Sequence, residues 1–328
     1  MLFIEKTIEV YNMREIIHYC CCSYERGDYG GVARYDYQIS KAFPNRVHFQ
    51  GPHEKDNMLS YASSCSNPII ITDNHLSCDI PNDFEVIIVH HGVAHTHAER
   101  EPQWDPYWKN LCCSGQQRML FHRDPEKTKV ISISKFCTDE FTRFYRQYYT
   151  KFERSDILHA SDLDESRFKD QWNDTPVVLG NWSTENKGSL IVRQLASLST
   201  FNFRTLDVKP VNSDIEDFNK RKQDIYLSSD IFLQLSLCEG NSYATLDALL
   251  CGLPIVASNV GLFYEDVPED CFVKVDWKQN GSISYVKDKI EEAWENRNTL
   301  SKNCRDWYLQ NCSFLDWTLK IRNLIEGK

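Results

Sequence analysis

The sequence has no apolar run approaching the roughly 20 residues that a membrane-crossing helix requires, so it predicts no transmembrane segment. It also has no CxxC pair of the kind that holds zinc. Its cysteines number thirteen, so they cannot all pair. Several are adjacent, at 20–22 and 112–113, and adjacent cysteines form disulfide bonds with each other poorly. The opening stretch MLFIEKTIEV is interrupted by charge and predicts no secretory signal. We therefore expect a cytoplasmic protein with mostly reduced thiols and at most peripheral membrane contact.

Basic residues are in the minority. There are 37 Lys and Arg against 47 Asp and Glu, a formal net charge of −10. A surface this acidic repels phosphate backbones, so we expect no nucleic-acid partner, although a local basic pocket for a small anion remains compatible with it. Internal repeats and low-complexity tracts are lacking too. What is present, 41% apolar residues over 328 positions, suits two domains better than one.

Short β-branched segments alternate with helical segments along the chain. Buried strands are expected at Glu15–Cys22, Pro68–Asp73 and Phe84–His90, and a second such series follows the polar stretch 162–175. This alternation is typical of parallel sheets covered on both faces. The predicted fold class is therefore α/β, with two Rossmann-like domains whose parallel sheets face a central cleft. We place the acceptor-side domain at residues 1–172, joined by a C-terminal helix at 313–328, and the donor-binding domain at 173–312.

The stretch SLCEGNSYATLDALLCGLPIVA at 236–257 carries the most information about chemistry. A strand brings Glu239 to its carboxyl end, and a helix begins at once near Ser242. The unpaired N–H groups at such a helix start suit a phosphate or a sugar hydroxyl. Asp247, eight positions after Glu239, is placed to bond a vicinal diol. A loop charge and a solvated helix face are equally good interpretations of these two acids by spacing alone.

The pattern acid–Gly–x6–acid–Ala–x3–Gly–x–Pro in this stretch resembles the signature of glycosyltransferase family 4, a family of retaining GT-B enzymes that use sugar nucleotides. The resemblance implies that Glu239 contacts hydroxyls of the donor sugar. It implies that Asp247, standing where the family has a second glutamate, holds the ribose. It also implies that backbone amides face the donor's phosphate or sugar at Asn241, Ser242 and Tyr243.

Further segments match the family in order, and the resemblance spans residues 15 to about 275. The loop GNWSTENKG at 180–188 resembles the family's phosphate-binding loop, with Lys187 on the lysine that binds the diphosphate and Asn181 on its arginine. Without that arginine, either another cation substitutes, or the enzyme is slow, or it is no enzyme. DYGGVA at 28–33 resembles the family's Gly-Gly turn, in which Gly30 and Gly31 permit close approach to donor phosphate or acceptor. A plain tight turn is the alternative there.

The run IIVHHGVAHTH at 87–97 places four histidines at the carboxyl end of a strand. A metal site is one interpretation, but the HExxH pattern and a nearby cysteine ligand are both missing. The resemblance instead implies that His91 touches the transferred sugar, and a purely structural histidine is the third possibility. His75 is a weaker cleft candidate. Trp104 and Trp108 lie where an acceptor could dock, although tryptophans on a helix more often belong to a core.

The function that the resemblance implies is transfer of a sugar from a nucleotide-diphosphate sugar to a hydroxyl of a glycan-type acceptor, with retention and without a metal or other cofactor. The base pocket is expected in segments such as 207–214. Two alternatives remain open: a catalytically lapsed sugar- or nucleotide-binding module, and a related fold that performs other nucleotide-sugar chemistry such as epimerisation.

Overall fold

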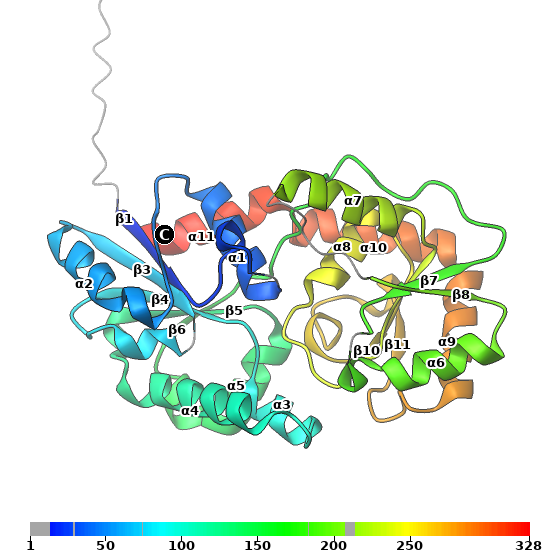
Figure 1. Ribbon diagram of the computed structural model, residues 1–328, viewed down its shortest axis with the longest axis horizontal. Helices are drawn as coiled ribbons and strands as arrows, with labels where there is room; N and C mark the ends of the chain where they lie inside the picture. The colour runs from blue at the N-terminus through cyan, green and yellow to red at the C-terminus, as the bar shows by residue number, and fades with distance from the viewer. Residues whose placement is uncertain (1–13, 29, 74, 183, 207–213) are drawn as a thin grey trace, which may run out of the picture.

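The computed structural model describes residues 14–328 except 29, 74, 183 and 207–213. Its chain forms two α/β lobes that lie side by side (Figure 1). Each lobe is built around one parallel sheet with helices packed against it, so the predicted α/β class with two Rossmann-like domains is confirmed. Most of the segment expected to hold the nucleotide base, 207–213, lies outside the described residues.

The first sheet has six parallel strands in the order β2-β1-β3-β4-β5-β6. Strands such as PIIITD and EVIIVH are almost continuously apolar because helices cover both faces of the sheet. The strands are β1 (Glu15–Cys20), β2 (Val47–Gln50), β3 (Pro68–Asp73), β4 (Glu85–His90), β5 (Thr128–Ser132) and β6 (Glu153–Asp156). The helices of this lobe are α1 (Gly31–Ala42), α2 (Lys55–Ser64), α3 (Ala94–Arg100), α4 (Pro106–His122) and α5 (Lys135–Tyr149).

The second sheet has five parallel strands in the order β11-β10-β9-β7-β8. Its strands are β7 (Val177–Gly180), β8 (Asn202–Thr205), β9 (Ile231–Gln234), β10 (Ile255–Ser258) and β11 (Val273–Val275). The helices that follow them are α6 (Ser189–Leu198), α7 (Ile215–Leu227), α8 (Tyr243–Cys251), α9 (Ile283–Glu295) and α10 (Arg297–Asn311). Every residue of helix α8 except Ala244 is buried, so its sequence lacks the polar face of a surface helix.

The last helix, α11 (Phe314–Glu326), returns to the first lobe (Figure 1). Its residues Trp317, Ile321 and Leu324 belong to the same apolar core as the strands of the first sheet. The Nζ of Lys129 on β5 donates a hydrogen bond to the carbonyl of Leu324 at 3.2 Å. The chain therefore crosses between the lobes twice, once at each end of the second lobe.

Several elements differ from the sequence-based expectation. Strand β1 ends at Cys20 rather than Cys22, because the backbone N–H of Cys21 turns to the Asp73 carboxylate at 2.8 Å. Helices α2 and α4 and strand β6 were not predicted. Strand β6, with the sequence ERSD, is a largely exposed edge strand and therefore shows no apolar alternation.

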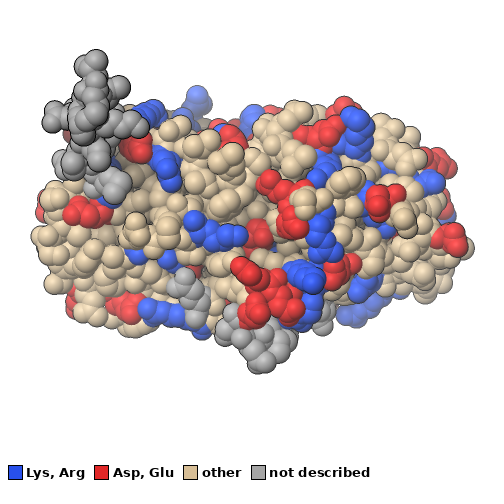
Figure 2. All heavy atoms as spheres, turned by 90° about the horizontal axis from the view of Figure 1, so that it is seen from above, with Lys and Arg blue, Asp and Glu red and all other residues tan. Residues whose placement is uncertain are grey.

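The charged side chains, the thiols and the helices bear on the sequence-based expectations. Acidic and basic side chains are interspersed over the second lobe in the view of Figure 2. All thirteen cysteines fall among the described residues, and each has a free thiol. Within the described residues, no helix combines the length and the apolar character needed to cross a bilayer.

Candidate functional site

Four of the sequence-predicted residues line one pocket at the carboxyl ends of strands β7 and β9. They are Asn181, Lys187, Glu239 and Ser242, which come from the loop after β7 and the loop that leads from β9 into α8. Carboxyl ends of parallel strands are where open α/β sheets bind ligands, so the topology brings these residues together.

The charged pair of this pocket is Lys187 and Glu239. The Nζ of Lys187 lies 3.3 Å from Oε1 of Glu239, and both side chains are partly exposed, 30% and 16%. Ser236 Oγ donates to the same Glu239 oxygen at 2.8 Å, which fixes the carboxylate. Gly188 holds the turn behind the lysine: its φ is +86°, and a Cβ there would lie 2.7 Å from Cβ of Leu235. The pair thus presents one cation and one acceptor to a ligand.

Helix α8 begins at this pocket with Ser242 as its N-cap. The Ser242 side chain makes no capping hydrogen bond, which leaves N–H groups of the first turn to other acceptors. Most of α8 is buried, and Ser242 and Ala244 at its start are half-buried, so the partial positive charge of this helix start is partly shielded from solvent. The helix start and Lys187 are therefore two groups of positive character at one pocket, and their contact with a phosphate remains a prediction.

The two lobes touch directly at the loop between β9 and α8. Asn241 Nδ2 donates to the carbonyl of Ile133 at 2.9 Å, and Ser134 Oγ donates to the carbonyl of Gly240 at 2.8 Å. From the first lobe, Arg100 on α3 donates through Nη1 to the carbonyl of Leu237 at 3.0 Å. These contacts hold the loop of Glu239 against the first lobe, so the structure is a closed arrangement of the two lobes.

On the first-lobe side of this contact, His91 follows the end of β4 and Asp73 ends the neighbouring strand β3. His91 Nε2 lies 3.0 Å from Oδ1 of Asp73. Burial of the Asp73 carboxyl alone would raise its pKa, but the hydrogen bond and charge of His91 and the N–H of Cys21 lower it to about 2. A carboxylate in this position fixes which ring nitrogen of His91 faces away from it.

Asp247 has partners that the sequence pattern did not suggest. Both of its oxygens accept from Arg34 on α1, at 3.0 and 2.9 Å, and Ser161 Oγ donates to Oδ1 at 2.6 Å. Lys222 on α7 lies 3.4 Å from Oδ2. Arg34 also pairs with Asp162 of the segment between the lobes. The carboxylate is 1% exposed in this interlobe ion network, and its predicted contact with a ribose remains a prediction.

Tyr243, the first residue of α8, lies beside both Arg34 of this ion network and the Gly-Gly turn. The Arg34 guanidinium lies 4.4 Å from the centre of the Tyr243 ring, and Tyr243 OH donates to Oε1 of Gln38 at 2.9 Å. A Cβ on Gly31, at the start of α1, would lie 3.6 Å from the Tyr243 ring, whereas one on Gly30 would meet nothing within 4 Å. Of the predicted pair, Gly31 thus lies beside Tyr243 at the start of α8, and Gly30 has no neighbour this close.

The other histidines of the 87–97 run have separate partners rather than a common centre. His90 is buried and stacks on Phe141, with ring centroids 4.1 Å apart, and burial lowers its pKa to about 3. His95 faces Tyr145 OH at 2.7 Å, and His97 Nε2 lies 2.5 Å from Glu101.

Trp108 is 54% exposed and so does not belong to a core.

Sequence reasoning missed four residues of this region: Asp73, Arg34, Arg100 and His159. His159 is buried and stacks on Tyr243 at 4.9 Å with the rings 7° from parallel. Only Asp73 carried a usable signal, an acid at the carboxyl end of a strand that precedes the histidine strand. The others act through contacts between segments distant in sequence, which no local pattern records.

No protein-family model and no curated protein matches this sequence. Solved structures do match. Sucrose-phosphate synthase from Thermosynechococcus elongatus aligns with a TM-score of 0.72 at 15% identity, covering 96% of this chain and 99% of that one. Anabaena HepE in complex with UDP aligns with a TM-score of 0.70 at 12% identity, covering 96% and 100%.

A third match is WaaG, a glycosyltransferase involved in lipopolysaccharide biosynthesis, with a TM-score of 0.61 at 13% identity and coverage of 95% and 100%. These are GT-B glycosyltransferase structures, and they match this chain over nearly its whole length. The chain therefore has the GT-B fold, as the sequence predicted. That fold agrees with the resemblance to family 4 found in the sequence motifs.

Proposed function

We propose that this protein is a retaining glycosyltransferase that moves a sugar from a nucleotide-diphosphate sugar to a hydroxyl of a glycan, lipid-linked or protein-linked acceptor. The observation that carries the proposal is the shared pocket of Lys187, Glu239 and Ser242 at the carboxyl ends of β7 and β9. One cation, one acceptor and a helix start are the groups that a diphosphate-linked sugar requires.

In this proposal the diphosphate binds at the start of α8, and Lys187 neutralises charge that develops on the leaving phosphate. The Lys187–Glu239 contact opens as the donor enters, so that Glu239 is free to accept from sugar hydroxyls. UDP, the ligand in the matching HepE structure, is the donor nucleotide to test first.

Arg100 is the cation that we propose to compensate for Asn181. Its guanidinium reaches the loop before Glu239 from the opposite lobe and lies 4.2 Å from the Trp277 ring centre. The adjacent Glu101 accepts from Asn186 Nδ2 at 2.8 Å, next to Lys187 in the chain. In the closed arrangement of the two lobes, Arg100 thus already contacts the donor loop.

His91 is proposed to orient the transferred sugar. Asp73 holds the ring, so a nitrogen of His91 is available to the cleft, where a side-chain exposure of 13% leaves room for a contact. No carboxylate is assigned as a covalent nucleophile. The reaction is then mainly positioning and electrostatic stabilisation, with the leaving phosphate accepting the acceptor proton on the same face.

The decisive experiment incubates the protein with UDP-, GDP- and ADP-sugars and a panel of glycan acceptors, and measures released nucleotide and the anomer of the product. We expect turnover with one donor class, an unchanged anomeric configuration, and equal rates with or without added Mg²⁺ or Mn²⁺. Nucleotide binding without turnover for every acceptor would favour the lapsed module, which the glycosyltransferase identity of the matching structures does not favour.

A further inference from the structure

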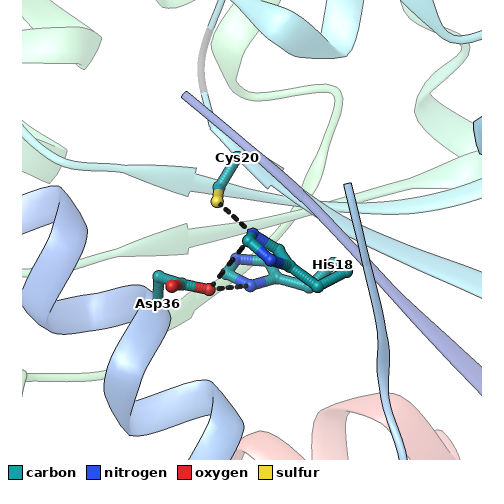
Figure 3. A group of neighbouring side chains, drawn as sticks. His18, Cys20 and Asp36 are labelled. Atoms are coloured by element: carbon teal, nitrogen blue, oxygen red, sulfur yellow. Dashed lines mark hydrogen bonds and ion pairs between the residues drawn. The ribbon is translucent and has the colours of Figure 1, made fainter. Parts of the chain in front are cut away.

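A group of side chains with metal-ligand chemistry lies in the first lobe, apart from the pocket of Lys187 and Glu239. It consists of His18 and Cys20 on β1, Asp36 on α1 and His48 on β2. One ligand atom from each residue lies within 4.8 Å of all the others. Figure 3 shows His18, Cys20 and Asp36 pointing toward one another.

The topology explains why these four side chains converge. His18 and Cys20 are two residues apart on one strand, so they project from the same face of the sheet. His48 is the register partner of His18 on the neighbouring parallel strand, which puts it on that face as well. Helix α1 covers this face and brings Asp36 to it. The convergence therefore follows from strand pairing and not from a compact sequence motif.

The distances suit a tetrahedral ion. His18 Nδ1 lies 2.9 Å and His48 Nε2 3.5 Å from Asp36 Oδ1, and Cys20 Sγ lies 3.1 Å from His48 Nε2. Zinc bonds of about 2.0–2.3 Å to nitrogen, oxygen and sulfur place neighbouring tetrahedral ligands about 3.3–3.7 Å apart. These three distances lie close to that range, and every pair of ligand atoms in the group lies within 4.8 Å, so movements of up to about 1 Å would admit an ion at its centre.

The environment of the group also favours an ion. Three of its residues are buried, with side-chain exposures of 1% for His18 and 0% for Asp36, and the His48 side chain is 11% exposed. Buried polar groups are costly unless they are fully partnered. Among the described residues, His18 Nδ1 finds no hydrogen bond of normal geometry despite its 2.9 Å approach to Asp36. Arg46 Nη2 lies 3.2 Å from Asp36 Oδ1, the kind of outer contact that holds a ligating carboxylate in place.

We propose that His18, Cys20, Asp36 and His48 bind one zinc ion with a structural role. Two imidazoles, one thiolate and one carboxylate are ligands that zinc accepts in a closed four-coordinate site. Binding releases the thiol proton that Cys20 now directs to the carbonyl of Cys22 at 3.1 Å. The proposed ion has a structural role only and takes no part in the proposed sugar transfer, which is expected to need no metal.

The site has a structural connection to the cleft. The chain continues from Cys20 to Cys21, whose N–H donates to Asp73 Oδ2 at 2.8 Å, and Asp73 holds His91. An ion that fixes the end of β1 would thus fix the residue that positions the cleft histidine. Because the proposal rests on the ligand group alone, it stands or falls independently of the glycosyltransferase activity.

The test begins with metal analysis of the full chain. A chelator then removes the metal, the stripped protein is checked to be folded, and it is titrated with Co²⁺. We expect one zinc per chain as purified and one Co²⁺ per stripped chain. The cobalt protein should show visible d–d bands of tetrahedral strength and a thiolate-to-cobalt band in the near ultraviolet. Zinc should raise the melting temperature of the stripped protein. A stripped, folded chain that takes up neither ion would overturn the proposal.

Matched variants separate this site from binding at the other thiols. Cys20→Ala should abolish the thiolate band, and His48→Gln should weaken Co²⁺ binding at least tenfold. Cys137→Ala removes another buried thiol of the same lobe and should change neither. Retention of the full cobalt spectrum by folded Cys20→Ala would contradict the assignment. If both site variants fail to fold, the stoichiometry and thiolate band of the unsubstituted chain decide the matter.

Discussion

Gly240 of the second lobe lies against His91 of the first: a Cβ at Gly240 would be 2.8 Å from the backbone carbonyl oxygen of His91. The same atom would be 3.0 Å from Ile133 Cδ1 and 3.2 Å from Gly92 Cα, both also in the first lobe. The absence of a side chain at this position is therefore what lets the donor loop close onto the histidine side of the cleft.

Gly240→Ala should hold the lobes apart without disturbing either one. We expect nucleotide binding to the second lobe to persist while kcat falls by about 10²-fold, because misplacement of reacting groups by about 1 Å has that effect. Steady-state kinetics and UDP calorimetry check this. Gly281→Ala is the matched control, since a Cβ there meets nothing within 4 Å. Equal kcat in the two variants would show that this contact does not govern turnover.

Lys187→Ala should reduce kcat by about 10²–10³-fold, the usual effect of removing one stabiliser of developing charge. Glu239→Gln should reduce kcat/KM by about tenfold, since it weakens rather than removes hydrogen bonding to the sugar. Released nucleotide is the measurement for both. Lys274→Ala, which removes an exposed lysine paired with Glu269 at 3.0 Å, should retain full activity. Activity retained by Lys187→Ala would exclude the proposed phosphate contact.

The pKa of Asp73, lowered to about 2 from an ordinary value of 3.8, makes a pH-dependent contribution to stability. A depressed folded-state pKa stabilises the protein above the unfolded value and loses that effect as pH falls toward the folded value. The contribution is about 2 kcal/mol at neutral pH, and about half of it is gone at pH 3. The difference in unfolding free energy between the unsubstituted chain and Asp73→Asn should therefore narrow between pH 5 and pH 3.

Urea unfolding at each pH measures this difference. Asp83→Asn, an exposed acid in the turn before β4, is the control and should show a small difference at every pH. A gap between the unsubstituted chain and Asp73→Asn that stays constant down to pH 3 would mean that the His91–Asp73 contact does not lower the pKa of Asp73.

The pKa of Asp266 is shifted in the opposite direction to that of Asp73, so its effect on stability has the opposite pH dependence. Burial raises the pKa of its carboxyl to about 7, although the carboxylate accepts the N–H of Lys135 across the lobes at 3.0 Å. A raised folded-state pKa means that ionisation costs stability, and this cost grows as pH rises from about 4 to 7. Asp266→Asn should therefore raise the melting temperature at pH 8 by a few degrees and leave it unchanged at pH 4. A lower melting temperature at pH 8 would contradict this.

Local sequence patterns predicted the parts of the structure that depend on local physics. The strands PIIITD and EVIIVH were predicted because β-branched apolar runs between turns have few other interpretations. Helix α4 was missed because polar and apolar residues are mixed around its axis, and β6 because it is an exposed edge.

The site was predictable only in part, for a similar reason. Lys187, Glu239 and Ser242 lie in short loops attached to strands, so their convergence follows once the sheet is parallel. The partners of Asp247 could not be predicted in this way. Arg34 is 213 residues away in sequence and contacts Asp247 only because the two lobes pack together. A local pattern can identify the acid on α8, but it cannot identify the cation that forms an ion pair with it.

The Arg34–Asp247 pair gives the last prediction, which separates a structural role of Asp247 from a ribose contact. Arg34→Met would leave Asp162 and Asp247 buried with Lys222 as the remaining cation nearby, so unfolding should become about 3–5 kcal/mol easier. The double variant with Asp247→Asn should lose less than the sum of the single losses, because the residues share one network. Chemical denaturation measures both quantities.

Arg221→Met on α7 removes an exposed pair with Asp217 and should cost less than about 0.5 kcal/mol, which makes it the control. UDP affinity of Asp247→Asn, measured well below its melting temperature, then decides the role of the carboxylate. A loss of UDP affinity in the folded variant supports the ribose contact, since the nucleotide would have to share Asp247 with Arg34. Unchanged affinity with lowered stability assigns Asp247 to the interlobe network alone.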